Sequence, residues 1–508
     1  MWSGRTVFIL AAIGSAVGLG NIWRFPYVAY SNGGGSFIVP YLIALLTAGI
    51  PLLFLDYALG HRFKGSPPLA FRRLKKPTEF LGWWQVGICF VIAVYYAVII
   101  AWALRYVFFS FNEAWGDDPA TFFGEDFLKQ DSSSSFGLDF VPGVVFPLLL
   151  VWIATLVILG LGVQKGIGAS AKFFVPVLIA LFGVLVVRSL FLEGANIGLD
   201  AFFHPDWSAL TDSSVWIAAY GQIFFSLSVG FGIMITYSSY LKRRTNLTGS
   251  GLVVGFTNSG FEMLAGIGVF ATLGYMASIS GVPVAEVVDS GIGLAFIAFP
   301  TIISSMPGGP FFGVLFFVSL LFAGFTSLIS IVQVCVAAVQ DKLGIGRVPA
   351  VIGVGGSMTV VSLLLFPTAT GLNTLDIVDN FANNIGIVSV ALIAVVTVTW
   401  VLRRLPEMQD HLNAVSSFKV GIVWRVFLGV ITPIVLAYML INEVVTRIND
   451  GYNDLPNGLV TAFGWAAQGL IVVVAILLTF TPWRRSADDL EYTPEHDAPD
   501  TTKVGEYS

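Results

Sequence analysis

The chain has 508 residues, of which 56% are hydrophobic and only 11% charged, with a formal net charge of −5 at pH 7. Soluble globular proteins carry about 25% charged residues, so this composition excludes an ordinary soluble domain. The apolar runs are close to 20 residues long, which is typical of membrane-spanning helices rather than of barrel strands. We therefore expect an all-α polytopic membrane protein.

The first apolar run, residues 6–30, is interrupted in its middle. It holds three glycines within residues 14–20, followed by Asn21 and Arg24. Each glycine weakens a helix by about 1 kcal/mol relative to alanine, and backbone groups freed inside a bilayer need new partners. We expect a broken helix with a binding site at the break. No basic segment precedes the run, so we interpret it as a span and not as a cleaved signal peptide.

Apolar runs bounded by polar residues predict about twelve spans of ~20 residues each. They lie near residues 6–30, 37–60, 81–111, 143–162, 167–192, 214–241, 248–278, 310–342, 348–367, 374–402, 418–443 and 458–481. We expect a single transmembrane domain over residues 1–485.

The sixth span carries a second interruption. The sequence Ala16-Val17-Gly18-Leu19-Gly20 recurs there as Ser228-Val229-Gly230-Phe231-Gly232. A matched pair of glycine-interrupted spans indicates the site of a secondary transporter built from inverted repeats. We expect one repeat over about 6–192 and a second over about 214–402, followed by two extra helices over about 418–481. Each repeat holds five spans, an odd number, so the second must be inverted in the membrane.

Basic residues gather in alternate loops between the predicted spans. They are Arg62, Lys64, Arg72, Arg73, Lys75, Lys76, Lys165, Lys242, Arg243, Arg244, Lys342, Arg347, Arg403, Arg404, Arg484 and Arg485, and the loops between are mostly acidic, for example with Glu286 and Asp289. The positive-inside rule then predicts a multi-pass protein of the cell membrane with both termini cytoplasmic.

Two stretches outside the spans carry their own predictions. Residues 280–309 mix apolar side chains with proline and glycine, which favours short helices over the extracellular mouth. Residues 486–508 are acidic and predict a disordered cytoplasmic tail.

The cysteines and histidines do not indicate a metal site or a disulfide. Cys89 and Cys335 lie in apolar runs and are interpreted as buried thiols. The four histidines, His61, His204, His411 and His496, fall in predicted loops or in the tail, so no metal cluster is expected within the membrane.

Polar residues inside spans are the strongest functional signal, because a charge at a helix centre costs about 2.5–3.5 kcal/mol on insertion scales. They are Asn21, Arg24, Asp56, Gln222, Ser226, Asn258, Glu262, Thr326, Ser327 and Asp379. The neutral oxygens among them, with carbonyls freed at the first break, suit a hard cation of low charge, and Na⁺ is the natural choice. For any one of these residues a helix-to-helix hydrogen bond is the alternative interpretation.

A broken helix also offers sites for an organic ligand. The second half begins with free N–H groups and a partial positive charge, which suits a carboxylate. Carbonyls around Phe225 and Ser228 can accept hydrogen bonds from an ammonium group. An amino acid satisfies both ends.

Four motifs resemble those of the prokaryotic neurotransmitter:sodium symporters. They are Gly-Ser-Ala-Val-Gly-Leu-Gly-Asn-Ile-Trp-Arg-Phe-Pro at 14–26, Asn-Gly-Gly-Gly-Ser-Phe at 32–37, Gly-Gln-Ile-Phe-Phe-Ser-Leu-Ser-Val-Gly-Phe-Gly at 221–232 and Phe-Ala-Gly-Phe-Thr-Ser at 322–327. The resemblance extends to about Trp483 and implies the leucine-transporter-like fold, a 5+5 inverted repeat with helices 1 and 6 broken.

The resemblance also implies two sodium sites and a substrate pocket. The first sodium site consists of Ala16, Asn21, Ser226 and Asn258 with the substrate carboxylate, and the second of Gly14, Val17, Ala323, Thr326 and Ser327. The pocket is lined by Ala16, Gly18, Leu19, Gly20, Ile92, Tyr96, Phe225, Ser226, Ser228, Phe231, Ser327 and Ile331. Gly18 stands where monoamine transporters carry an aspartate, which favours an amino acid over a biogenic amine.

Further roles follow from the same resemblance. Arg24 and Asp379 are expected to form an outer gate once substrate binds, with Gln222 steadying Arg24. Trp2, Tyr240 and Asp341 match inner-gate positions, but the family's N-terminal arginine has no counterpart in the sequence as given, and Arg5 is a candidate substitute. Glu262 stands where chloride-dependent relatives have a small hydroxyl residue, with Tyr41, Gln222 and Ser226 as expected neighbours, so its carboxylate is expected to replace chloride.

These observations predict a sodium-coupled symporter that imports an amino acid, with an apolar side chain favoured, by alternating access and without chloride. Its expected partners are sodium ions, the amino acid and the lipid bilayer, with no nucleic acid. The nearest alternative is a proton-coupled carrier of the same architecture; a channel or a membrane enzyme fits less well, because bulky phenylalanines occupy the midplane and the spans hold no nucleophile-and-base set. The sequence leaves open which amino acid is carried, the ion stoichiometry and the oligomeric state.

Overall fold

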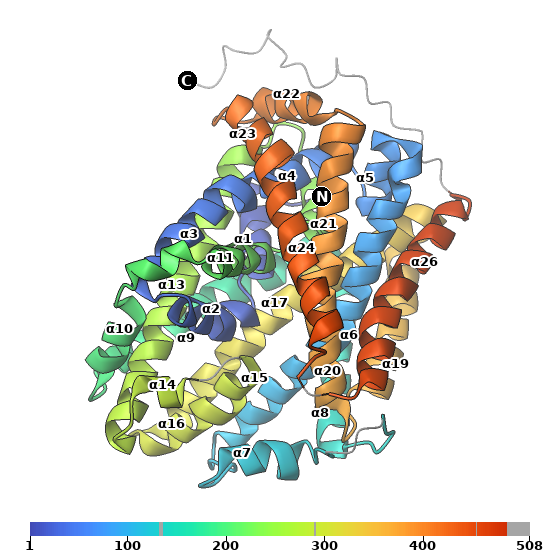
Figure 1. The fold of residues 1–508 in the computed structure, drawn as a ribbon. Coiled ribbons are helices and arrows are strands. Elements are labelled where there is room, and N and C mark those ends of the chain that lie inside the picture. Colours follow the sequence, from blue (N-terminus) through green and yellow to red (C-terminus); the bar gives the residue numbers. More distant parts are fainter. Residues whose placement is uncertain (132–135, 289–290, 454, 485–508) are drawn as a thin grey trace.

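The computed structural model describes residues 1–131, 136–288, 291–453 and 455–484, which are predominantly helical (Figure 1). Ten helical stretches in these ranges are long and apolar enough to cross a membrane. They are built on α3 (Ile38–Ala44) with α4 (Ile50–Phe63), α6 (Glu79–Phe109), α8 (Pro142–Gly160), α9 (Ala169–Leu190), α13 (Leu247–Ser280), α17 (Gly309–Leu343), α18 (Arg347–Ala350) with α19 (Gly356–Leu365), α20 (Gly371–Asn380) with α21 (Val388–Val396), α23 (Ile422–Val426) with α24 (Thr432–Asn449), and α25 (Asn457–Leu459) with α26 (Ala467–Phe480). The predicted tail, Asp289 and Arg485 lie outside the described residues.

Two pairs of shorter helices lie at the two predicted breaks, and the first pair counts as an eleventh candidate span among the described residues. α1 (Arg5–Ala16) and α2 (Leu19–Ser31) meet at a bend of 55°. α11 (Ser213–Ser226) and α12 (Ile233–Ser239) are separated by six residues in which Ser228 and Gly230 have φ values of +53° and +82°. A left-handed conformation is costly for a serine, so this segment is held by its surroundings.

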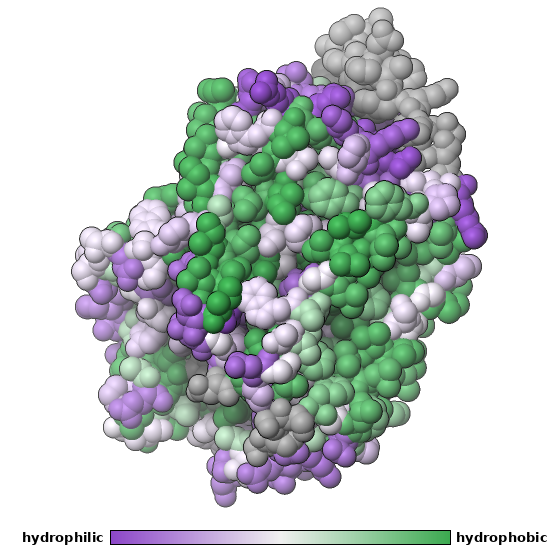
Figure 2. Space-filling view, turned by 45° about the vertical axis from the view of Figure 1, so that its right-hand side comes forward, coloured by the Kyte–Doolittle hydropathy of each residue, from purple (hydrophilic) through white to green (hydrophobic). Residues whose placement is uncertain are grey.

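The outer surface is that of a membrane protein. In Figure 2 hydrophobic side chains cover much of the middle of the molecule, and hydrophilic ones gather toward its upper and lower ends. Large apolar side chains such as Phe173, Ile434 and Phe480 are more than half exposed. Such exposure is stable against lipid and not against water, so the chain is a multi-pass membrane protein.

The two ends of the helix bundle carry different short helices (Figure 1). The N-terminus, α5 (Pro67–Leu74) and α22 (Leu405–Val415) lie at one end, which we call the terminal face. α7 (Pro119–Thr121), α14 (Val284–Val287) and α16 (Phe299–Ser305) lie at the other end, the vestibule face. The last two confirm the short helices expected within residues 280–309.

The predicted loop positions of two histidines, His61 and His411, are wrong, because both lie in helices. His61 lies in the last turn of α4 and is only 2% exposed. Its Nδ1 is 3.0 Å from Nε2 of His411 on α22, and its Nε2 is 2.9 Å from the carbonyl oxygen of Lys242. The sequence misplaced His61 because α22, an amphipathic helix more than 300 residues later, packs over the end of α4 and extends the buried region.

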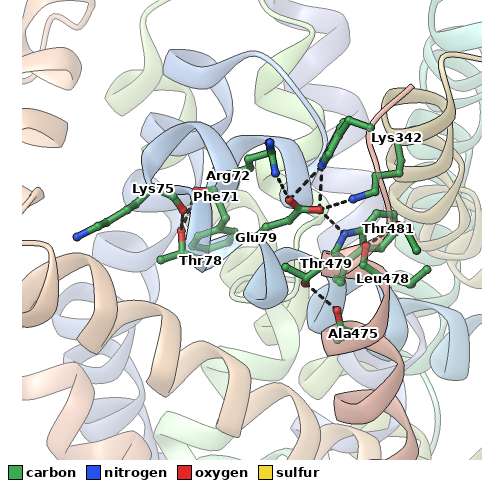
Figure 3. Close-up of polar contacts among 12 residues, drawn as sticks. Phe71, Arg72, Lys75, Thr78, Glu79, Lys342, Ala475, Leu478, Thr479 and Thr481 are labelled. Atoms are coloured by element: carbon green, nitrogen blue, oxygen red, sulfur yellow. Dashed lines mark hydrogen bonds and ion pairs between the residues drawn. The ribbon is translucent and has the colours of Figure 1, made fainter. Parts of the chain in front are cut away.

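A buried carboxylate joins four segments at the terminal face (Figure 3). Glu79, the first residue of α6, has no exposed surface. Its oxygens accept hydrogen bonds from Arg72 of α5 (2.8 Å), Lys342 of α17 (2.6 Å) and the indole N–H groups of Trp83 and Trp483 (3.0 Å each). We call these five residues the Glu79 cluster.

The Glu79 cluster fixes the end of the last span. The ammonium group of Lys342 lies 4.6 Å from the centre of the Trp483 ring, and the backbone N–H of Arg484 donates to the Lys342 carbonyl at 3.0 Å. A buried ion pair is stable only when its remaining donors and acceptors are also satisfied, and the two indoles meet that condition. The segment that follows α26 is therefore attached to α6 and α17.

Candidate functional site

The two helix breaks face each other across a cavity. Its lining contains every residue that the sequence predicted for the substrate pocket, from α1 and α2, α6, the α11–α12 break and α17. The space between the side chains, counted with its open mouth, is about 540 Å³. The structure therefore brings all twelve residues together around one cavity.

Five further residues line the cavity and were missed: Ser15, Tyr95, Ile233, Asn383 and Ile387. Two of them had a signal in the sequence. Asn383 and Ile387 follow Asp379 at intervals of four residues, so all three share one helix face. The other three had none, because each lies one or two positions from a residue already assigned and only the backbone path decides which side chain turns inward.

The glycines at the first break allow a close approach. A Cβ atom on Gly18 would lie 3.1 Å from both the Tyr96 hydroxyl and Ser327 Oγ, and one on Gly20 would lie 2.1 Å from the Phe225 ring. The backbone N–H of Leu19, the first residue of α2, is 3.4 Å from the Tyr96 hydroxyl. The N–H groups of a helix start and a tyrosine hydroxyl thus lie close together, an arrangement that suits a carboxylate.

Three of the four residues predicted for the first sodium site, Asn21, Ser226 and Asn258, lie in contact, and Ala16 lines the same cavity. Asn21 Nδ2 donates to Asn258 Oδ1 at 2.9 Å and lies 3.4 Å from Ser226 Oγ, and Asn258 Nδ2 also donates to Ser226 Oγ. The three side chains are at most 2% exposed. Asn21 Oδ1 in turn accepts the N–H of Gly18 at 2.9 Å. This cluster therefore lies directly against the helix break.

The residues predicted for the second sodium site converge on the other side of α1. Ser327 Oγ lies 3.4 Å from the Gly14 carbonyl oxygen and 3.2 Å from that of Ala323. Thr326 Oγ1 lies 3.0 Å from the Ala323 oxygen. Val17 is buried at the end of α1. The site offers neutral hydroxyl and carbonyl oxygens, the ligands that hard cations prefer.

Glu262 is completely buried next to the first cluster. Its carboxylate accepts hydrogen bonds from the Tyr41 hydroxyl and from Gln222 Nε2, the latter at 2.6 Å. Gln222 was expected both to steady Arg24 and to lie beside Glu262, and its amide group donates to Glu262. The Arg24 guanidinium instead lies over the Phe225 ring, 4.6 Å from its centre.

A vestibule leads from the vestibule face down to this cavity. Arg24 and Asp379 both line it, as do Tyr96 and Phe225 at its base. Among the described residues Arg24 and Asp379 form no ion pair, and Asp379 accepts a hydrogen bond from Asn383 at 2.8 Å. The vestibule and the cavity thus share the side chains of Tyr96 and Phe225, and the predicted outer pair lies apart.

Comparison with known proteins identifies the family. A family model described as the sodium:neurotransmitter symporter family matches residues 1–135 and 117–485. The chain belongs to this family. It is 40% identical to an uncharacterized sodium-dependent transporter of Methanocaldococcus jannaschii, over 94% of this chain and 96% of that protein. It is 32% identical to the mouse sodium- and chloride-dependent neutral and basic amino acid transporter B(0+), over 90% of this chain and 81% of that protein. It is 30% identical to the human sodium- and chloride-dependent taurine transporter, over 95% of this chain and 85% of that protein.

The family relationship gives the fold and the class of activity. The symporter has the leucine-transporter-like fold with about twelve membrane helices, as expected. The family consists of sodium-dependent secondary transporters and not of enzymes.

Three side chains hold the unwound segment of the symporter between α11 and α12. The Gly230 N–H donates to Asp56 Oδ2 at 3.0 Å, and Gln85 Nε2 donates to the Gly230 carbonyl at 2.9 Å. Cys89 Sγ lies 3.2 Å from the Phe231 carbonyl oxygen. Asp56 was visible in the sequence as a charge within a span. Gln85 also lies within a predicted span but was not singled out, and Cys89 was interpreted only as a buried thiol.

The predicted inner-gate residues of the symporter lie at the terminal face. The Trp2 indole donates to the Tyr237 carbonyl at 2.8 Å, and Asp341 Oδ2 accepts the backbone N–H of Ser66 at 2.8 Å. Tyr240 accepts a hydrogen bond from Gln333 at 2.8 Å. Arg5, the candidate substitute cation, donates to Ser250 Oγ at 2.9 Å instead.

Proposed function

We propose that this symporter imports an apolar amino acid together with Na⁺, through two sodium sites and without chloride. The observation that carries the proposal is the cavity itself. It lies between two helix breaks, and two groups of neutral oxygen ligands lie at its edge. Amino-acid transport is also named for one relative, the mouse B(0+) transporter.

The amino acid is proposed to bind with its carboxylate at the start of α2. The N–H groups there and the Tyr96 hydroxyl are the donors, and the first sodium ion, beside Asn21, is the counter-charge. The carbonyls of the α11–α12 break accept hydrogen bonds from the ammonium group. Ile92, Ile331 and Phe231 line the rest of the cavity, which favours an apolar side chain.

Transport is proposed to follow alternating access. Sodium and substrate complete the site from the vestibule, Arg24 and Asp379 then approach each other, and the terminal face opens. Each positive charge that crosses inward gains about 2.3 kcal/mol per 100 mV of membrane potential. In this orientation, which the positive-inside pattern supports, the terminal face is cytoplasmic and the protein lies in the cell membrane.

The decisive experiment is uptake by proteoliposomes that hold the purified protein. A mixture of radiolabelled amino acids is supplied under an inward sodium gradient, and then under a proton gradient with sodium replaced by choline. We expect accumulation only with sodium, and the retained label identifies the substrate. Accumulation under the proton gradient alone would establish the proton-coupled alternative and remove both sodium assignments.

One double variant tests the second sodium site, and a single variant serves as its control. Thr326→Ala/Ser327→Ala should raise the half-saturating sodium concentration by about tenfold or more, equivalent to ~1.4 kcal/mol of lost ion binding. Thr155→Ala is a matched control, since Thr155 is equally buried but its hydroxyl bonds only to Val151 of its own helix α8. Equal sodium dependence in both proteins would contradict the second site.

Chloride independence rests on Glu262. Uptake should persist when chloride is replaced by gluconate, and Glu262→Ser should make uptake require chloride, because the buried negative charge is then missing. A chloride requirement in the unmodified protein would refute this part of the proposal and leave the sodium sites untouched.

A further inference from the structure

A second cavity lies away from the transport path, toward the vestibule face, between α9, α13, α16 and α17. Its walls are apolar and include Phe182, Val269, Ile302, Ile303 and Phe316, each at most 3% exposed. The space between these side chains, its mouth included, is about 490 Å³. We call it the α9–α13 slot.

The hydroxyl groups in the slot walls need no hydrogen bond from a ligand. Two hydroxyl groups line it, and both are satisfied within their own helices. Ser189 Oγ donates to the Val186 carbonyl at 2.8 Å, and Thr272 Oγ1 donates to the Gly268 carbonyl at 2.7 Å. A hydrocarbon chain could therefore enter without leaving a buried polar group unpaired.

One charged group lines the slot. Arg188 lies in the last turn of α9, near the end of a membrane span, where lipid headgroups are expected. Its guanidinium lies over the Phe312 ring, 5.5 Å from the ring centre. Among the described residues it forms no hydrogen bond or ion pair, although Glu193 follows only five residues later. The five donors of Arg188 are thus available to an anion.

We propose that the α9–α13 slot binds a phospholipid, with an acyl chain between the helices and the phosphate diester on Arg188. The two parts of the site match the two parts of such a molecule: apolar walls for the chain, and one guanidinium of planar, forked geometry for the phosphate oxygens. A free inorganic phosphate would leave the slot unfilled, and a neutral hydrocarbon would leave Arg188 without a partner.

The bound lipid would contact helices that also carry the transport site. α13 holds Asn258 and Glu262, and α17 holds Thr326 and Ser327. α16 lies at the vestibule face. An acyl chain in the slot fills the space among these three elements and so stabilises their packing. The inference concerns lipid binding alone and does not depend on which amino acid or ion is carried.

The test uses the full chain in detergent, with phosphatidylglycerol that carries a photoreactive acyl chain. We expect the label on peptides of α9, α13 or α17, and retention at least about fivefold lower in Arg188→Ala, because one charge-assisted contact is lost. Thr272→Leu, which fills the slot but keeps Arg188, should also lower retention. Diacylglycerol with the same chains should bind more weakly than phosphatidylglycerol, and inorganic phosphate should not displace the lipid.

Arg105→Ala is the matched control. Arg105 also lies near the vestibule-face end of a span, with its guanidinium 4.6 Å from the centre of the Phe109 ring, but it does not line the slot. It should leave retention unchanged. If Arg188→Ala fails to fold, Arg188→Lys, which keeps the charge, should retain part of the binding. Labelling elsewhere, or equal retention in the Arg188, Thr272 and Arg105 variants, would overturn the proposal.

Discussion

The two ends of the bundle differ in whether their charged side chains are paired. At the terminal face the carboxylate of Glu79 is fully buried and accepts hydrogen bonds from four side chains, two of them cationic. At the vestibule face Arg24 and Asp379 line one open space, and neither forms an ion pair in the part of the chain that the structure describes. Charges that are fully satisfied hold helices together, whereas charges left apart can pair later and drive a change of shape.

The largest effect is expected at the terminal face. Glu79→Ala leaves the buried Lys342 ammonium without its counter-charge, which should lower the free energy of unfolding by about 3–5 kcal/mol. Thermal unfolding of the purified protein measures the change, and Glu443→Gln is the control, because the Glu443–Arg447 pair is about 20% exposed and contributes about 0–1 kcal/mol. A double variant, Glu79→Gln/Lys342→Met, should recover part of the loss. Equal destabilisation by Glu79→Ala and Glu443→Gln would contradict a special role of the buried Glu79 in stability.

A kinetic effect without a stability effect is expected at the vestibule. Asp379→Asn keeps the shape of the side chain but removes the charge that is proposed to meet Arg24 during closure. Uptake should fall about tenfold or more while equilibrium substrate binding changes by less than about threefold, since the lost interaction forms only after binding. Asp376→Asn is the control, because Asp376 lines the same vestibule but accepts a hydrogen bond from Asn453. A parallel loss of binding and uptake would assign Asp379 a static role.

The smallest effect is expected inside the cavity. A methyl group on Gly18 would press on the Tyr96 hydroxyl and Ser327 Oγ, so Gly18→Ala should weaken substrate binding about five- to tenfold, at a cost of ~1 kcal/mol. Isothermal titration in the presence of sodium measures the affinity. Gly183→Ala in α9 is the control, because its added Cβ would meet no atom within 4 Å. Unchanged affinity in Gly18→Ala would show that the substrate does not approach the backbone there.

The sequence predicted those features that depend on local composition. Span positions follow from runs of apolar residues, and the breaks follow from glycines near residues 14–20 and 228–232. The lining of the cavity followed from the resemblance in four motifs, and the structure places all twelve of those residues around one space. The 5+5 inverted relation between the halves stays a prediction.

What the sequence did not reveal depends on residues far apart in the chain. Glu79 meets Trp483 across more than 400 positions, and His61 meets His411 across 350. A single sequence carries no record of such pairs, and short helices such as α22 are too brief to stand out by hydrophobic periodicity. The sequence placed Gln222 beside both Arg24 and Glu262, and only coordinates show that its amide donates to Glu262.

The attachment of the last span has a practical consequence for measuring motion. Because Arg484 is hydrogen-bonded to the end of α17 and Trp483 to Glu79, the segment directly after α26 is attached to two of the longest helices. A spin label or fluorophore placed at position 484 would therefore serve as a stationary reference. Changes in its distance to a second label on α1 or α12 would then report the displacement of those half-helices alone.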